Sequence, residues 1–127
     1  MVAALAVVNA LGEVLSADGR VLAGVRDREE EGPAWPELLL EPGSTTSSNT
    51  TLVVVATDAD LDRAQCRKLA EISHDGLALS IRPVHTLADG DTVFALSKGN
   101  REVDPLVLGV GAVEVVRRAV ARAVGGD

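Results

Sequence analysis

The run TLVVVA at residues 51–56 is the feature that most constrains how this chain can fold. Three consecutive valines favour a β-strand, because β-branched side chains pack well on a pleated surface. Uninterrupted apolar character is typical of a strand that is buried on both faces. A Ser/Thr-rich tract precedes the run and a helical pattern follows it. The sequence therefore predicts an interior strand at 51–56 that leads from a loop into a helix.

The segment after this strand predicts a helix within residues 57–80. Asp62 and Gln65 have the spacing of a capping box, in which each side chain bonds to the other residue's backbone. Pro83 is expected to stop the helix, since proline removes a backbone donor. Five residues fall on one face at helical spacing and are expected to face the core: Cys66, Leu69, Ala70, Ser73 and Leu77.

The remaining elements are read from shorter signals. Residues 2–8 predict a buried strand. An Asp-Gly turn at 16–20 is followed by 21–24, which predict a short strand that pairs back. Residues 92–97 predict a further strand. Residues 27–48, which include Trp35, predict a loop. Pro105 opens a last helix over 106–124, whose apolar stripe is Ala112, Val116, Ala119 and Ala123. We expect a single domain over 1–127 with a layered α/β fold.

Composition narrows the classes of partner. The net charge of -7, from 19 acidic and 12 basic residues, disfavours a nucleic-acid partner. No apolar stretch reaches the length of about 18 residues that a membrane helix needs. The one cysteine, Cys66, excludes an internal disulfide framework, and we expect a cytoplasmic protein with Cys66 in the core.

The tripeptide Asn49-Thr50-Thr51 at the mouth of the valine strand allows three interpretations. It is a loop-to-strand junction, where threonine is common. It is also an N-glycosylation sequon, which the lack of a secretory signal disfavours. Thirdly, a threonine is a nucleophile when a base activates its hydroxyl, and a free N-terminal amine supplies one. Thr50 gains that amine only if the chain is cut between Asn49 and Thr50.

Two further segments carry candidate site residues. A tight turn is sufficient to explain the tripeptide Asp89-Gly90-Asp91. Alternatively, its two carboxylates could orient an ammonium group or hold a metal. Asn9 follows the first strand, where it serves either as a turn residue or as an amide donor to an oxyanion.

Several other patterns are rejected. Residues 58–62 resemble the start of a calcium loop, but Arg63 and Leu69 replace the glycine and glutamate that such a loop requires. His74 and His85 have no partner at metal-ligand spacing. A Ser-His-Asp triad is not favoured, because almost any chain with two histidines offers one.

The order of these motifs resembles the L-aminopeptidase/D-esterase family, which includes β-peptidyl aminopeptidases and nylon-oligomer hydrolases. The segments that carry the resemblance are VVATDA after a Thr, then LAEISHDGLA, RPVHT and DGDTVFAL, together with VAALAVVNALGEV and the C-terminal Ala/Val/Arg helix. The resemblance covers nearly the whole chain. It implies a self-processing N-terminal-nucleophile hydrolase.

Carried onto this sequence, the resemblance implies a cut between Asn49 and Thr50, with Thr50 as the nucleophile. Asn9 then stabilises the oxyanion, and Asp89 and Asp91 orient the nucleophile and its amine. The implied fold is a four-layer α/β/β/α sandwich. The implied substrate is a small peptide or amide, and neither a metal nor another cofactor is expected.

One departure from the family is large, since its members are about three times the length of this chain. The chain is expected to be the C-terminal third, with 1–49 as the tail of the α-subunit-like region and 50–127 as the β-subunit-like region. The chain alone is expected to have poor activity. It is also expected to associate, either as a homo-oligomer or with a missing N-terminal portion, because a sheet without its neighbours exposes edges and apolar faces. Two alternatives remain open: a non-catalytic fragment or pairing subunit, and an acyltransferase related to ornithine acetyltransferase.

Overall fold

The computed structural model describes residues 1–24 and 49–125. The elements in chain order are β1 (Val2–Val7), β2 (Glu13–Leu15), β3 (Val21–Ala23), β4 (Leu52–Ala59), α2 (Arg63–Ala78), β5 (Ile81–Arg82), β6 (Thr92–Arg101) and α3 (Pro105–Ala123). The predicted loop 27–48, with Trp35, lies outside the described residues. None of the helices within the described ranges has the length and apolarity needed to cross a membrane.

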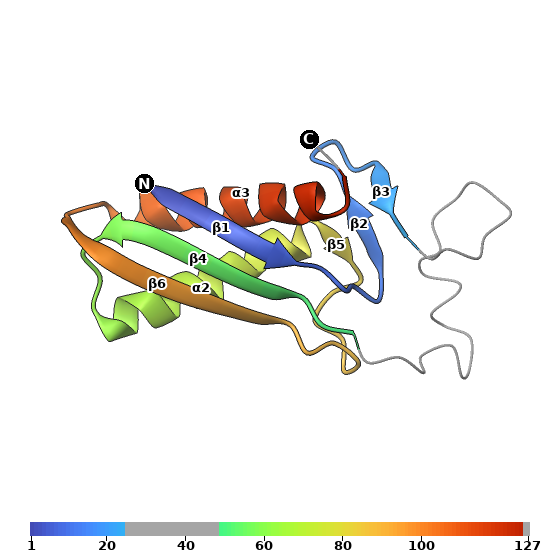
Figure 1. Cartoon of the computed structure of the whole chain (residues 1–127), viewed down its shortest axis with the longest axis horizontal. Coiled ribbons are helices and arrows are strands. Elements are labelled where there is room, and N and C mark those ends of the chain that lie inside the picture. Colours follow the sequence, from blue (N-terminus) through green and yellow to red (C-terminus); the bar gives the residue numbers. More distant parts are fainter. Residues whose placement is uncertain (25–48, 126–127) are drawn as a thin grey trace, which may run out of the picture.

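The larger sheet has the strand order β1-β4-β6. β4 lies in the middle, antiparallel to β1 and parallel to β6. Both helices lie on the same side of this sheet, and a smaller sheet of order β3-β2-β5 stands at one end (Figure 1). The α/β expectation is confirmed, in the form of one sheet layer covered by one helix layer.

The core lies between this sheet and its two helices. Val53 and Val55 of β4, Leu77 of α2, and Val116 and Val120 of α3 all have no exposed surface. Complete burial of such side chains stabilises the fold by about 1.5–3 kcal/mol each. Aliphatic side chains therefore build this core, as the scarcity of aromatic residues requires.

The opposite side of the larger sheet is open. The prediction that the valine strand is buried on both faces is wrong, because burial alternates along β4 with Leu52 and Ala56 exposed. Alternation has period two in any strand, and in the described chain only one face meets the helices. Five large apolar side chains, between 45% and 70% exposed, form what we term the open sheet face: Leu5, Val7, Leu52, Phe94 and Leu96.

Helix α2 has the predicted capping box, since Asp62 and Gln65 each bond to the other's backbone. Its predicted inner face is buried or half-buried. The helix ends at Ala78, however, well before Pro83. Ile81 is only 3% exposed and pairs with Val14 of β2, so tertiary pairing replaces further helix with the short strand β5.

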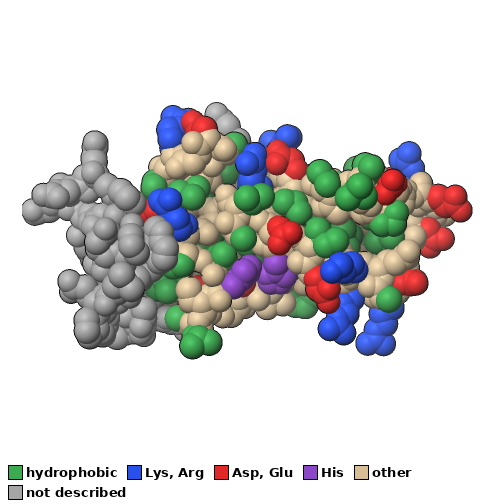
Figure 2. All heavy atoms as spheres, turned by 180° about the vertical axis from the view of Figure 1, so that it is seen from behind, with side chains coloured by type: hydrophobic (Ala, Val, Ile, Leu, Met, Phe, Trp, Pro, Cys, Tyr) green, Lys and Arg blue, Asp and Glu red, His purple; other side chains and the backbone are tan. Residues whose placement is uncertain are grey.

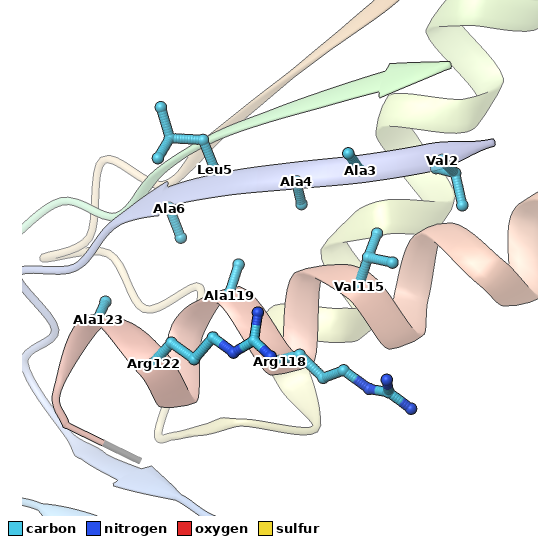
Figure 3. Close-up of a pocket in the computed structure, with 10 residues that line it drawn as sticks. All are labelled: Val2, Ala3, Ala4, Leu5, Ala6, Val115, Arg118, Ala119, Arg122 and Ala123. Atoms are coloured by element: carbon cyan, nitrogen blue, oxygen red, sulfur yellow. The ribbon is translucent and has the colours of Figure 1, made fainter. Parts of the chain in front are cut away.

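Helix α3 confirms only part of its predicted stripe. Ala112 and Val116 are fully buried, whereas Ala119 is half-buried and Ala123 is exposed. Figure 3 shows Ala119 and Ala123 facing β1 across a cavity of about 540 Å³, while Leu5 points away from the helix. Methyl groups are too short to close this space, so both alanines keep exposed surface.

The β2–β3 hairpin turns at Ser16–Arg20, as the Asp-Gly signal predicts. Gly19 takes φ 83°, a conformation that favours glycine. Strand β6 runs to Arg101, beyond the predicted end at residue 97, because Arg101 still pairs with Ala59 after an irregularity in β4.

Candidate active site

The Asn49–Thr50 peptide group is held from both sides at the entrance to β4. The backbone N–H of Gly90 donates to the Asn49 carbonyl at 2.8 Å, and the N–H of Thr50 donates to the carbonyl of Asn9 at 3.0 Å. The N–H of Asn49 donates to the carbonyl of Ala88 at 3.3 Å. The ends of β1 and the turn before β6 meet here because both strands flank β4 in the sheet. The bond that the sequence singles out is therefore fixed in space.

The hydroxyl of Thr50 lies against this same peptide group. Its Oγ1 donates to the Asn49 carbonyl oxygen at 2.7 Å, and the residue is half-buried. Gly90 approaches so closely that a Cβ at that position would lie 2.8 Å from Thr50 Oγ1. The Gly90 N–H thus points at the oxygen that becomes negative if a nucleophile adds to the carbonyl carbon, which is the geometry of an oxyanion donor.

The neighbouring Thr51 has a different environment. It has no exposed surface, and its backbone N–H donates to Asp91 Oδ1 at 2.9 Å. Its Oγ1 is buried and makes no hydrogen bond within the described part of the chain. The structure therefore separates the two threonines: Thr50 presents its hydroxyl to the peptide bond, and Thr51 anchors the strand.

The two aspartates of the turn also have different contacts. The side chain of Asp91 is 4% exposed, and its Oδ2 lies 3.1 Å from His85 Nδ1. The Oδ2 atom of Asp89 accepts hydrogen bonds from the Thr86 backbone N–H at 3.0 Å and the Thr86 hydroxyl at 2.6 Å. Asp89 also forms a parallel bridge with Asn49. Asp91 thus fixes the residue after the nucleophile candidate, and Asp89 fixes the turn that carries Gly90.

Asn9 lies at the end of β1, where its carbonyl receives the Thr50 N–H. It lines a cavity of about 520 Å³ whose other walls come from Val8, 10–12, Val14, 23–24 and Val124. Asn9 therefore borders this cavity and also bonds to the Thr50 backbone, whereas Thr50 itself does not line the cavity. The larger cavity between β1 and α3 does not include any of the predicted site residues.

Fold and sequence together bring Asn9, Asn49, Thr50, Asp89 and Asp91 to one place. The sequence predicts no function for Gly90 or His85. Gly90 is expected only as a turn residue, and no sequence signal indicates its approach to Thr50. His85 is a candidate only for metal or triad chemistry, which the sequence does not favour. In residues 1–24 and 49–125, no three His, Cys, Asp or Glu side chains gather as a metal site.

Comparison with known proteins gives a match over almost the full sequence. Residues 1–125 match the family described as Peptidase family S58. An uncharacterized aminopeptidase of Mycobacterium leprae is 44% identical over 106 residues, which are 77% of this chain and 29% of that protein. One from Mycobacterium tuberculosis is 57% identical over 60 residues, 47% of this chain and 17% of that protein.

A 6-aminohexanoate-oligomer endohydrolase of Agromyces sp. is 29% identical over 140 residues. The match covers 94% of this chain and 39% of the endohydrolase. The chain thus spans less than half the length of each of these three relatives.

Proposed function

The chain belongs to peptidase family S58, and from that membership we propose that it carries the nucleophile of a self-processing amidohydrolase. One observation carries the proposal. The Thr50 hydroxyl and the Gly90 N–H both reach the Asn49 carbonyl oxygen, at 2.7 Å and 2.8 Å. A nucleophile and an oxyanion donor on one carbonyl are the minimum that acyl transfer requires.

The first proposed reaction is cleavage of the Asn49–Thr50 bond. Thr50 Oγ1 adds to the Asn49 carbonyl carbon, and the Gly90 N–H faces the oxygen that becomes negative. The C–N bond then breaks and the hydroxyl proton passes to the departing nitrogen, which leaves an ester between the two residues. One water molecule hydrolyses the ester, so that Asn49 ends in a carboxylate and Thr50 begins with a free amine and a free hydroxyl.

The second proposed reaction is turnover of an amide substrate. The new Thr50 amine takes the hydroxyl proton, directly or through water, and Oγ1 forms an acyl-enzyme that water hydrolyses. The Asn9 side chain is proposed as the oxyanion donor, supported by the backbone bond that places Asn9 beside the Thr50 nitrogen. Asp91 and Asp89 orient the nucleophile through Thr51 and the turn. No metal or cofactor takes part in this scheme.

The names of the relatives suggest the substrate class. The Mycobacterium proteins are named aminopeptidases and the Agromyces protein acts on 6-aminohexanoate oligomers. We take small peptides or linear amides as the substrates here. The net charge of -7 supports a small substrate over nucleic acid, and the single cysteine supports a cytoplasmic location.

We further propose that the chain is the C-terminal part of a longer fold and that the N-terminal portion of that fold covers the open sheet face. Five large apolar side chains at 45–70% exposure are more than a soluble domain normally leaves together. The relatives are long enough to supply a second sheet. Without that portion, the chain acts as a non-catalytic pairing subunit or associates with itself.

The pairing proposal is tested with matched surface variants. Phe94→Lys places a charge on the open sheet face, whereas Leu79→Lys alters an equally exposed residue at the end of α2. We expect light scattering to show less self-association for Phe94→Lys and no change for Leu79→Lys. A wild-type chain that stays monomeric and does not bind the N-terminal portion contradicts the proposal.

Mass spectrometry tests the cleavage. The expressed chain, alone and together with the N-terminal portion, is expected to yield a fragment that begins at Thr50. Thr50→Ala should abolish the cut, and Thr51→Val, which replaces a buried hydroxyl without a described hydrogen bond, should leave it intact. An uncut wild-type chain under both conditions, or a cut that survives in Thr50→Ala, refutes the proposed function.

A further inference from the structure

The buried carboxylate of Asp91 has one oxygen in need of a partner. Oδ1 accepts the Thr51 N–H, but Oδ2 receives no hydrogen bond of good geometry from the described chain. The side chain is only 4% exposed, so water can solvate very little of this carboxylate. A buried carboxylate is costly unless a positive group lies beside it. The position of Thr51, and with it Thr50, therefore depends on what faces this second oxygen.

His85 is the group that faces it. Its Nδ1 lies 3.1 Å from Asp91 Oδ2, while the ring keeps 37% of its surface exposed. His85 has φ 57°, a left-handed conformation that residues other than glycine rarely adopt. Such a conformation persists only where surrounding contacts hold it, and it is common at functional sites.

Helix α2 supports the ring from its other side. The His74 ring meets the His85 ring edge to face, with centroids 4.8 Å apart and planes at 62°. Figure 2 shows the two imidazoles side by side on the surface seen from behind. One ring therefore connects solvent to a buried carboxylate that holds the nucleophile strand.

The charged groups around His85 come from two elements. Helix α2 presents His74, whose pKa is lowered chiefly by burial and then by the charge of His85, against the opposing effects of Asp91 and Asp75. The segment before β6 presents Asp91, while the carboxylate of Asp89 in the same segment is engaged by Thr86. The lowered pKa of His74 favours its neutral form. Of the two rings, His85 is the one in contact with the Asp91 carboxylate.

We infer that His85 is a positioning residue for self-cleavage: its imidazolium holds the Asp91 carboxylate in the orientation that accepts the Thr51 N–H and so fixes the Thr50 hydroxyl on the Asn49 carbonyl. The inference rests on the proposed function. Loss of the His85 proton leaves Asp91 without its counter-charge, and the strand entrance loosens. Cleavage therefore requires the charged form of His85, and its rate depends on pH.

Kinetics of cleavage provide the first test. His85→Asn keeps a residue that tolerates positive φ but removes the titratable charge. We expect about tenfold slower cleavage, the order expected for one buried charge-assisted contact, and loss of the pH dependence that the wild type shows. His74→Gln removes the edge contact but leaves the Asp91 contact, and it should retain a pH-dependent rate. A pH profile in His85→Asn that matches the wild type overturns the inference.

A second test does not need cleavage. In the uncut Thr50→Ala chain, the NMR shift of the Thr51 amide should titrate together with the His85 ring, and His85→Asn should remove that titration. A Thr51 amide that ignores the His85 titration overturns the inference even if cleavage occurs. A Thr51 amide that follows His85 in a wild-type chain that stays uncut refutes the proposed function and supports the contact itself.

Discussion

Replacement of Gly90 by alanine tests the geometry of the candidate nucleophile directly. The added Cβ would lie 2.8 Å from Thr50 Oγ1, while the next nearest atoms, Asn49 O and Thr50 Cβ, are both at 3.8 Å. Gly90 does not have a positive φ, so alanine fits the backbone and the single short contact is the whole perturbation. Since ordinary contacts begin at 3.4 Å, relief requires a shift of about 0.6 Å.

A shift of this size at a reacting atom has a predictable cost. Misplacement by about 1 Å reduces rates by about 100-fold, so we expect Gly90→Ala to slow cleavage by about 10- to 100-fold. The assay is the intact mass of the chain followed over time. Gly109→Ala is the matched control, because its Cβ meets Ile72 at an ordinary 3.5 Å and lies on α3, away from the site.

Stability provides an independent measure of the same contact in chains that cannot cleave. In Thr50→Val a methyl group replaces Oγ1, so Gly90→Ala should cost about 1–3 kcal/mol of unfolding free energy through overpacking. In Thr50→Ala the conflicting atom is absent, and the cost should nearly vanish. Urea denaturation of the four chains gives the coupling. Equal costs in both backgrounds, or wild-type cleavage in Gly90→Ala, refute the placement of the Thr50 hydroxyl against Gly90.

Three further outcomes are expected. Gly109→Ala should raise the free energy of unfolding in urea by about 0.5–1 kcal/mol, since glycine is unfavourable inside a helix and space is available; a loss of stability contradicts this packing. Arg82→Ala should lower the free energy of unfolding by about 1–2 kcal/mol, because it removes the 2.8 Å ion pair between the half-exposed Arg82 and Glu13, whose side chain is 3% exposed. Thermal denaturation with an unchanged Tm would count against it. The hydrogen bond from Arg118 lowers the pKa of Glu114, so Arg118→Gln should be less stable than wild type above the ordinary pKa of that carboxyl. That difference should disappear as pH falls through the lowered pKa, and a difference that persists in acid would show another cause.

Local signals predicted the elements that depend on local contacts. The valine run defined β4, and the Asp62–Gln65 pair defined the start of α2, because propensity and capping act within a few residues. Strands β2 and β5 were not predicted. They have three and two residues, and they exist because Val14 and Ile81, far apart in the sequence, pair with each other.

In the candidate site, too, some residues could be predicted from the sequence, whereas the contacts between elements could not. Thr50, Asn9 and the two aspartates could be named from motif order, since each stands at a strand end or turn. The contact of Gly90 with Thr50 and that of His85 with Asp91 could not, because they depend on how the turn before β6 folds over the entrance to β4. Such contacts follow from tertiary structure and leave no periodic trace in the sequence.

Each of the two sheets contains strands from both sides of the peptide bond between residues 49 and 50. β1 lies on one side of that peptide bond in the sequence, while β4 and β6 lie on the other. In the smaller sheet, β2 and β3 precede the bond and β5 follows it. Scission would therefore nick the molecule without dividing it, and the two pieces would co-elute in native buffer. Once unfolded, they could recover the native state only by a bimolecular encounter, so a processed molecule would owe its lifetime to slow unfolding more than to efficient refolding.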